Sequence, residues 1–277
     1  MLISYRTRRS SNGVNRLDKK FIDLKNKNKK AFITYICTGD PDLDFTKKAV
    51  LGFDKIGVDI VELGIPFSDP IADGPTIQRA SGRALRNKIT ISKALALVRE
   101  IRKRSEIPLV FMSYFNPIFR YGLKRFAKEA ASSGLDGVIV ADLPFEESKA
   151  LYEILKSYDI ANIFLIAPTT KKERLSKILK RAEGFIYYIS LTGITGARKK
   201  LSVELGKKLK FIKSLTGKPI CVGFGISQAL QIKKIKAFCD GVIVGSAIID
   251  VIEKNIDKKD LTKKILYFTK TLIRATK

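Results

Sequence analysis

The sequence predicts an α/β fold, a single (β/α)8 TIM barrel, and two features of its pattern support that prediction. Eight short runs rich in apolar residues recur from residue 31 onward, each about the length of a strand. Amphipathic stretches of helical length lie between them. Apolar strands joined by helices indicate a parallel sheet covered on both faces. Eight such units match a closed barrel better than an open doubly wound sheet, which stays the alternative.

The predicted elements alternate along the whole chain. In order, the strands are 32–37, 59–63, 109–114, 137–141, 162–167, 184–190, 219–223 and 241–245. The helices between them include 91–103, 123–133, 146–157, 172–182 and 203–216. Lys is absent from the cores of these strands although it is frequent elsewhere, which argues against a Schiff-base aldolase with its amine on a barrel strand.

Length and composition limit the class of protein. A chain of 277 residues with 45% hydrophobic content can form one barrel domain, which we place at 19–277, after a flexible basic extension at 1–18. The formal charge of +26 would suit nucleic acid, an anionic surface or a phosphorylated substrate. The lysines are scattered, so we interpret them as solvated helix faces. The sequence contains no His, so carboxylates must carry out any proton transfer.

The three cysteines indicate a reducing compartment. Cys37, Cys221 and Cys239 are odd in number and lack CxxC spacing. No apolar run reaches the length of a membrane helix, and the start of the chain lacks the apolar core of a secretory signal. We therefore expect a cytoplasmic protein. The alternative is the plastid stroma, because the basic start faintly resembles a transit peptide.

The segment 59–76 is the most informative part of the chain. Strand alternation places Glu62 on the face opposite Val61 and Leu63, so Glu62 points into the barrel if that other face packs on helices. Burial would raise the pKa of its carboxyl and allow it both to donate and to accept a proton. Asp69 and Asp73 follow in a long loop. Each carboxylate alone could be an ion-pair partner or a turn residue, but all three on one strand and its loop favour catalysis.

Three glycine-bearing turns follow the last three predicted strands, at 192–196, 223–227 and 245–247. Glycine allows the backbone to approach an anion closely, and the start of the next helix adds free N–H donors. The loops after the seventh and eighth strands are the usual phosphate site of this barrel class. Glycine also ends strands for packing reasons, but several such turns together favour a phosphate site opposite Glu62.

These residues resemble the alpha subunit of tryptophan synthase over about residues 31–252. The markers are 38–41, 62–76, 112–116, 141–144, 193–196, 223–227 and 245–247. The resemblance implies a lyase that cleaves indole-3-glycerol phosphate into indole and glyceraldehyde 3-phosphate by a retro-aldol step.

The resemblance also implies a role for each site residue. Glu62 falls on the general acid/base, and Asp73 on the carboxylate that binds the indole N–H. Tyr187 matches a tyrosine near the catalytic Glu, and Tyr35 an aromatic wall beside the indole, although Tyr35 could simply fill the barrel. The phosphate turns are matched by Gly196, Gly223, Gly225, Gly245 and Ser246.

The resemblance implies a partner as well. The alpha subunit docks on a beta subunit in an α2β2 heterotetramer; the beta subunit holds pyridoxal phosphate, and this chain itself is expected to have neither cofactor nor metal. Asp69 and Thr195 would lie in mobile loops that close over substrate and signal to the partner. Leu191 stands where some members carry Arg, so that signal could differ.

Other functions remain open at this point. A basic nucleic-acid-binding barrel would need clustered Lys and Arg with exposed aromatic residues, and the scattered charge argues against it. A subunit that only activates its partner would not need Glu62 and Asp73. A stand-alone lyase that releases indole would share every residue named above.

Overall fold

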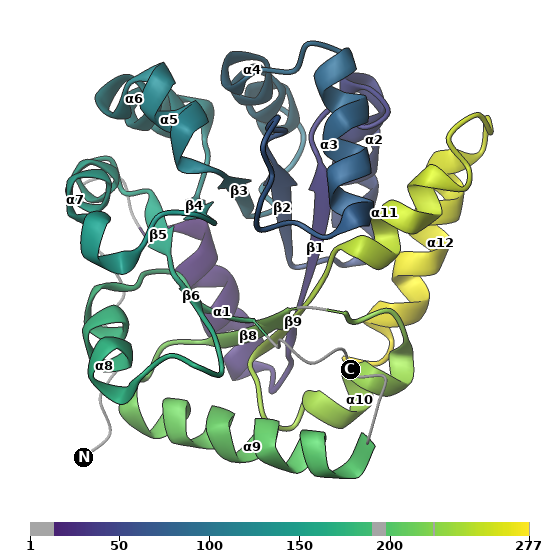
Figure 1. The fold of residues 1–277 in the computed structure, drawn as a ribbon. Helices are drawn as coiled ribbons and strands as arrows, with labels where there is room; N and C mark the ends of the chain where they lie inside the picture. Colours follow the sequence, from purple (N-terminus) through teal and green to yellow (C-terminus); the bar gives the residue numbers. More distant parts are fainter. Residues whose placement is uncertain (1–13, 190–197, 224, 277) are drawn as a thin grey trace.

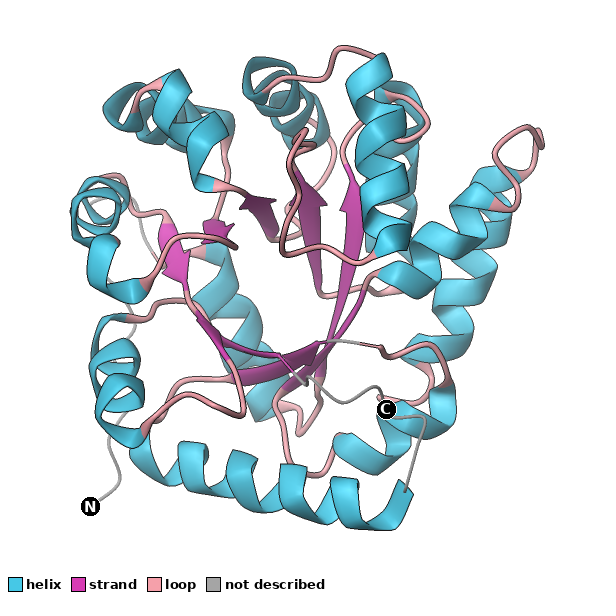
Figure 2. Ribbon diagram, viewed as in Figure 1, coloured by secondary structure: helices cyan, strands magenta, loops and turns pink. Residues whose placement is uncertain are grey.

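The strands form one parallel barrel (Figures 1 and 2). The chain closes it at Phe164. The computed structural model describes residues 14–189, 198–223 and 225–276. The sheet order is β5-β4-β3-β2-β1-β9-β8-β7-β6, with every neighbouring pair parallel. The strands are β1 Ala31–Cys37, β2 Ile60–Gly64, β3 Leu109–Ser113, β4 Gly137–Val140, β5 Ala161–Ile163, β6 Leu165–Ile166, β7 Ile186–Ile189, β8 Ile220–Gly223 and β9 Gly241–Val244.

The two strands at the ends of this order are consecutive in the chain. Only Phe164 separates β5 from β6, and its carbonyl accepts the backbone N–H of Tyr187 at 3.1 Å. The fifth predicted strand is therefore two short strands with a break between them. Because the covalent chain joins the two ends of the sheet, the predicted barrel is confirmed over the open sheet.

Helices cover the outside of the barrel (Figure 2). Their ends follow local signals: Asp42 caps α2 by accepting the Phe45 N–H at 2.7 Å, Pro75 begins α3, and Gly134 ends α6 in the left-handed conformation. The helices are α1 Arg16–Asn26, α2 Leu43–Ile56, α3 Pro75–Arg86, α4 Ile91–Arg102, α5 Phe115–Tyr121, α6 Leu123–Ser133, α7 Lys149–Ser157, α8 Lys172–Arg181, α9 Arg198–Leu215, α10 Ala229–Ile235, α11 Ser246–Glu253 and α12 Leu261–Ile273, with a 3₁₀ turn η1 at Phe145–Glu147.

The strand residues alternate between two apolar clusters. Val61 and Leu63 belong to the large cluster that includes the buried helix faces, whereas Ile60 belongs to a smaller cluster with Ile33 and Ile243 inside the barrel. Glu62 shares the inward face with Ile60, as the alternation predicts. Burying both faces of the strands explains why they are apolar nearly throughout.

Helix α1 packs at the end of the barrel where the strands begin, with Leu17 against Gly137 and Gly184. Leu17 and Phe21 join the interior cluster, and the side-chain amide of Asn15 donates to the backbone carbonyls of Asp136 and Asp159 at 3.0 and 2.9 Å. Helix α1 thus begins within the segment 1–18 that we predicted as an extension, and Leu17 is completely buried.

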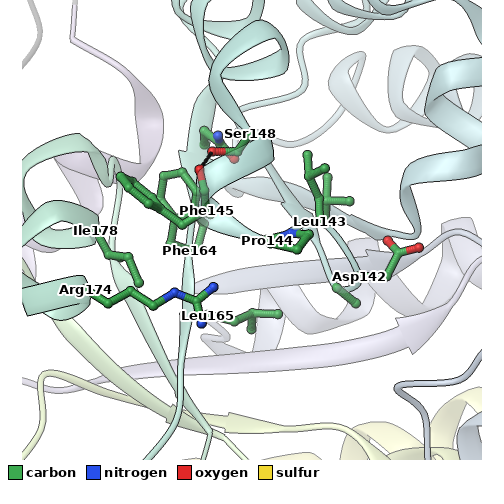
Figure 3. Close-up of a pocket in the computed structure, with 13 residues that line it drawn as sticks. Asp142, Leu143, Pro144, Phe145, Ser148, Phe164, Leu165, Arg174 and Ile178 are labelled. Carbon is green, nitrogen blue, oxygen red and sulfur yellow. Dashed lines mark hydrogen bonds between the residues drawn. The ribbon is translucent and has the colours of Figure 1, made fainter. Parts of the chain in front are cut away.

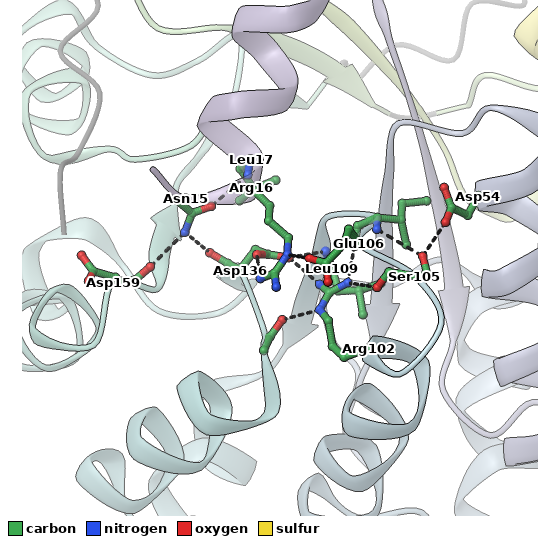
Figure 4. A network of polar contacts seen from close by, with 12 residues as sticks. Asn15, Arg16, Leu17, Asp54, Arg102, Ser105, Glu106, Leu109, Asp136 and Asp159 are labelled. Atoms are coloured by element: carbon green, nitrogen blue, oxygen red, sulfur yellow. Dashed lines mark hydrogen bonds and ion pairs between the residues drawn. The ribbon is translucent and has the colours of Figure 1, made fainter. Parts of the chain in front are cut away.

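The same end of the barrel holds an ion-pair network centred on the buried Asp136. Asp136 accepts hydrogen bonds from Arg102 Nη2 at 2.7 Å, Arg16 Nη1 at 3.1 Å and the Leu109 backbone N–H at 2.8 Å (Figure 4). Arg16 also pairs with Glu106. The network ties α1 to the starts of β3 and β4, so it stabilises the base of the barrel.

All three cysteines are free and buried. Burial raises the pKa of the Cys37 and Cys221 thiols well above the usual range and that of Cys239 to about 12. In the part of the chain that the structure describes, no helix is both long and apolar enough to cross a membrane.

Candidate active site

Glu62 is a completely buried carboxyl group on the inner face of β2. Neither of its carboxylate oxygens has a hydrogen-bond partner among the described residues. Burial alone raises the pKa of Glu62 to about 8, because a low-dielectric interior disfavours the charged form. Glu62 therefore holds a proton at neutral pH and can donate it.

Two buried tyrosines lie near Glu62 at the mouth of the barrel. Tyr35 on β1 is in register with Glu62 and Tyr187 extends from β7. The Tyr35 hydroxyl stands over Gly64, where a Cβ atom would lie only 2.2 Å from it, and the Tyr187 hydroxyl would lie 2.4 Å from a Cβ on Gly223. Glycine at both positions therefore leaves room for the tyrosine rings.

Asp73 lies at the end of the loop that follows β2. Its Oδ2 accepts a hydrogen bond from the Tyr114 hydroxyl at 2.9 Å, and that hydroxyl accepts one from the Ala72 backbone N–H at 3.0 Å. Burial raises the pKa of the Asp73 carboxyl, while the hydrogen bond from Tyr114 opposes that rise. The loop and the end of β3 thus hold Asp73 in one orientation.

A cavity of about 330 Å³ brings most of the predicted site residues together. Asp73, Tyr35 and Tyr187 line it, and so do Gly225, Gly245 and Ser246 from the far side. The remaining walls are Ala72, Gly74, Pro75, Thr76, Ile77, Met112 and Ile243. Glu62 is not on the lining. It lies on β2, paired with Tyr35 of β1 and two residues before Gly64.

The far side of this cavity has the features of an anion site. Ser246 begins α11 directly after Gly245, so the first backbone N–H groups of that helix lie at the cavity wall. Gly225 has φ of +68°, which only glycine adopts at little cost. Gly223, by contrast, is not on the lining and packs against Tyr187.

One of the predicted residues, Asp69, falls outside this cavity. Asp69 lies in the β2 loop, where its Oδ2 accepts the Ser68 hydroxyl at 2.6 Å in an exposed position. Thr195 and Gly196 lie outside the described residues, as does Leu191.

The sequence prediction missed the part that Tyr114 plays. Tyr114 directly follows β3, so it stands at the same edge of the barrel as the loop that carries Asp73. A polar aromatic residue at the carboxyl end of a predicted strand was the signal that could have identified it. Its partner could not be read from the sequence, because 41 residues separate the two.

A second cavity, of about 220 Å³, opens beside β4 and β6 (Figure 3). Phe145, Phe164 and Ile178 give it apolar walls, and Arg174 reaches in from α8 while pairing with Glu146 at 3.0 Å. Asp142 is its carboxylate, and its Oδ1 accepts the Phe115 N–H at 2.7 Å. Since this cavity lacks a matched acid and base, the candidate chemistry belongs to the first one.

No metal site was found within the described ranges, where no three Cys, Asp or Glu residues are grouped to hold an ion. The acid and base candidates there are carboxyls and tyrosines. Burial raises the pKa of both Tyr35 and Tyr187 well above the usual range, so neither ionises at neutral pH. Glu62 and Asp73 are therefore the groups that can exchange protons or stabilise positive charge.

Comparisons with known proteins find relatives that match most of the chain. The family model for the tryptophan synthase alpha chain matches residues 21–277. The tryptophan synthase alpha chain of Caldanaerobacter subterraneus subsp. tengcongensis is 44% identical over 259 residues, which cover 94% of this chain and 98% of that one. The alpha chain of Methanocaldococcus jannaschii is 45% identical over 249 residues, covering 90% and 88%.

Solved structures show the same similarity. The alpha subunit of tryptophan synthase from Legionella pneumophila str. Paris superposes with a TM-score of 0.89 and 37% identity, covering 95% of this chain and 99% of that one. Tryptophan synthase from M. tuberculosis in an aminoacrylate-bound form gives a TM-score of 0.85 and 30% identity, covering 95% and 100%.

Proposed function

The chain belongs to the tryptophan synthase alpha chain family, and from this premise we propose how its own residues carry out the family's reaction. It is a carbon–carbon lyase that cleaves indole-3-glycerol phosphate to indole and glyceraldehyde 3-phosphate, and it passes the indole to a beta subunit. The pyridoxal phosphate belongs to that beta subunit, and the alpha chain carries no cofactor.

Glu62 acts as the general acid and then as the general base. Its protonated carboxyl transfers a proton to indole C3, which leaves positive charge on the ring nitrogen. Loss of the proton from the adjacent side-chain hydroxyl then forms the aldehyde, and the electrons of the breaking carbon–carbon bond return to the ring as indole. The pKa of about 8 supports this role, because the carboxyl is protonated before the reaction and can accept a proton after it.

Asp73 binds the indole N–H and stabilises the charge that develops on the ring nitrogen. Its place on the cavity wall and its hydrogen bond from Tyr114 support this assignment. A fixed carboxylate aimed at a developing cation acts without reorganising during the reaction. Tyr35 supplies an aromatic wall beside the ring, and Tyr187 lines the same cavity near Glu62.

The phosphate group binds across the cavity from Asp73. The N–H groups at the start of α11, at Gly245 and Ser246, and the backbone of Gly225 supply donors, and the helix dipole favours the negative charge there. Gly196 and Gly223 are assigned to the same group by their match to the family motif.

The beta subunit docks at the mouth of the barrel, with Asp69 and Thr195 in the loops that respond to it. The exposed position of Asp69, four residues before Asp73, supports this placement. We place the complex in the cytoplasm, a reducing compartment that suits three free thiols.

The observation that carries this assignment is the buried, unpartnered Glu62 beside a cavity that also holds Asp73. The test is indole release from indole-3-glycerol phosphate by wild type and Glu62→Gln, each with and without a pyridoxal-phosphate beta subunit. We expect turnover that the partner stimulates and the substitution abolishes. Full activity in Glu62→Gln would refute the acid–base assignment, and no indole from wild type would leave only a structural role.

A further inference from the structure

Four charged side chains form a continuous network that joins two helices and one loop of the barrel. Arg79 and Arg83 lie one turn apart on α3, Glu253 ends α11, and Asp40 lies in the loop after β1. The last of these belongs to the motif at 38–41, to which the proposed reaction gives no role.

Arg83 is the centre of the network. Its Nε and Nη2 donate to the two carboxylate oxygens of Asp40 at 2.7 and 2.9 Å, and its Nη1 donates to Glu253 Oε1 at 2.8 Å. Arg79 adds a two-pronged contact, with Nε and Nη2 each 2.8 Å from a Glu253 oxygen. The Asp40 side chain is fully buried and that of Arg83 only 13% exposed, so solvent screens this pair weakly.

The two helices joined by this network begin on opposite sides of the candidate active site. Helix α3 starts at Pro75, two residues after Asp73, and Gly74, Pro75 and Thr76 all line the cavity. Helix α11 starts at Ser246, on the anion side of the same cavity. Helices are stiff over two or three turns, so a clamp near their far ends sets the separation of their N-termini.

We propose that Arg83, held by Asp40 and Glu253, is a positioning residue that fixes the distance between the carboxylate of Asp73 and the phosphate-binding N-terminus of α11. The proposal rests on the function proposed above, because that function puts the two ends of one substrate at these two places. Arg83 touches neither end and acts through the helices.

The chemistry of the contacts supports arginine specifically. A guanidinium presents several N–H groups in a rigid plane, so one side chain can bind the two oxygens of Asp40 and one of Glu253 together. Lysine keeps the charge but cannot make these contacts at fixed angles. Because an error of about 1 Å in placing reacting groups can cost up to about a hundredfold in rate, a rigid clamp has a direct effect on catalysis.

The test compares ligands that occupy one end of the site with a ligand that spans both. Indole probes the Asp73 end, glycerol 3-phosphate probes the phosphate end, and indole joined to phosphate by a three-carbon chain probes their separation. Dissociation constants are measured for the full-length wild type, Arg83→Lys and Glu253→Gln. Arg125→Met is the control, since Arg125 pairs with Glu129 on the exposed surface of α6.

We expect both variants to bind the two single-ended ligands as wild type does and to lose about tenfold in affinity for the linked ligand, because only that ligand depends on the distance. The kcat of cleavage should fall together with the affinity for the linked ligand. Arg125→Met should match wild type in all three affinities and in kcat. Equal weakening of all three ligands would show that the network only maintains the fold, and unchanged binding of the linked ligand would also overturn the proposal.

The result for wild type separates this proposal from the one on which it rests. If wild type binds the linked ligand no more tightly than glycerol 3-phosphate, the two-ended site itself is wrong. If wild type gains from the linkage and the variants keep that gain, the site stands and the positioning role fails. Glu253→Gln keeps an oxygen acceptor and the shape of the side chain. It therefore tests the positioning role even if Arg83→Lys does not fold.

Discussion

The Tyr114 hydroxyl donates a hydrogen bond of 2.9 Å to Asp73 Oδ2 while accepting one of 3.0 Å from the Ala72 backbone N–H. One buried phenol thus fixes both the carboxylate and the loop that carries it. Because the bond to Tyr114 lowers the pKa of Asp73, its loss leaves the full effect of burial, which raises that pKa.

We expect Tyr114→Phe to lower kcat/KM by about tenfold, the value of one hydrogen bond to a charged group. The acidic limb of its pH–rate profile should move to higher pH, since Asp73 then protonates more readily. Steady-state kinetics over a pH series measures both effects. Tyr267→Phe, at a position that is 77% exposed, is the control. An unmoved acidic limb would show that Tyr114 does not act through Asp73.

The buried carboxyl of Glu62 should make stability depend on pH. Its pKa is about 8 in the folded chain and near 4.5 when the chain unfolds, so between these values the folded state holds a proton that the unfolded state has lost. The free energy of unfolding should therefore fall by about 1.4 kcal/mol per pH unit as pH rises from about 4.5 to 8, and level off above.

Glu62→Gln removes this contribution. Urea unfolding of wild type and variant at pH 5, 6.5, 8 and 9 should show a difference that grows in favour of the variant up to about pH 8. A difference that is constant across the series would mean that Glu62 is charged in the folded protein.

Two glycines of the same region should respond in opposite ways to alanine. A Cβ on Gly64 would lie 2.2 Å from the Tyr35 hydroxyl, so Gly64→Ala must displace that ring toward the cavity. We expect a loss of about 1–3 kcal/mol in stability and a raised KM. Gly82, within α3, has open space around its Cβ position, so Gly82→Ala should stabilise by about 0.5–1 kcal/mol and leave KM unchanged. Thermal unfolding and kinetics on both variants check the contrast.

The base of the barrel should affect stability without affecting chemistry. Asp136→Asn removes the charge that pairs with Arg102 and Arg16 in a buried site, so we expect it to cost about 3–5 kcal/mol in unfolding free energy. Activity per folded molecule should stay at the wild-type level, because this network lies at the end of the barrel opposite Asp73. Urea unfolding and kinetics test this, with the exposed Asp257→Asn as control. A fall in activity at full folding would show that the two ends are coupled.

The sequence predicts those parts of the molecule whose cause is local. The two-residue alternation around Glu62 predicts its inward direction, and the helix predicted at 123–133 has the bounds observed for α6. The break at Phe164 was not predicted, because an apolar run looks the same whether or not its hydrogen bonds continue.

Contacts between distant residues explain most of what the sequence could not predict. The Arg83 network joins residues 43 and 170 positions apart. Asp40 lies in a recognisable motif, but nothing local to it or to Glu253 shows that Arg83 binds both. The start of α1 at Arg16 was obscured by the basic residues around it, since nothing in their pattern shows that Leu17 fills the base of the barrel.

The three buried thiols also report when the barrel opens. Cys37 on β1, Cys221 on β8 and Cys239 before β9 are each no more than 1% exposed, and burial raises the pKa of every one of these thiols. Alkylation must therefore wait until the barrel opens. If the three react at one common rate, the strands open as a single unit; if Cys37 lags behind the other two, the strands that follow α9 separate first. The rate of thiol labelling thus times the opening of the barrel without any added probe.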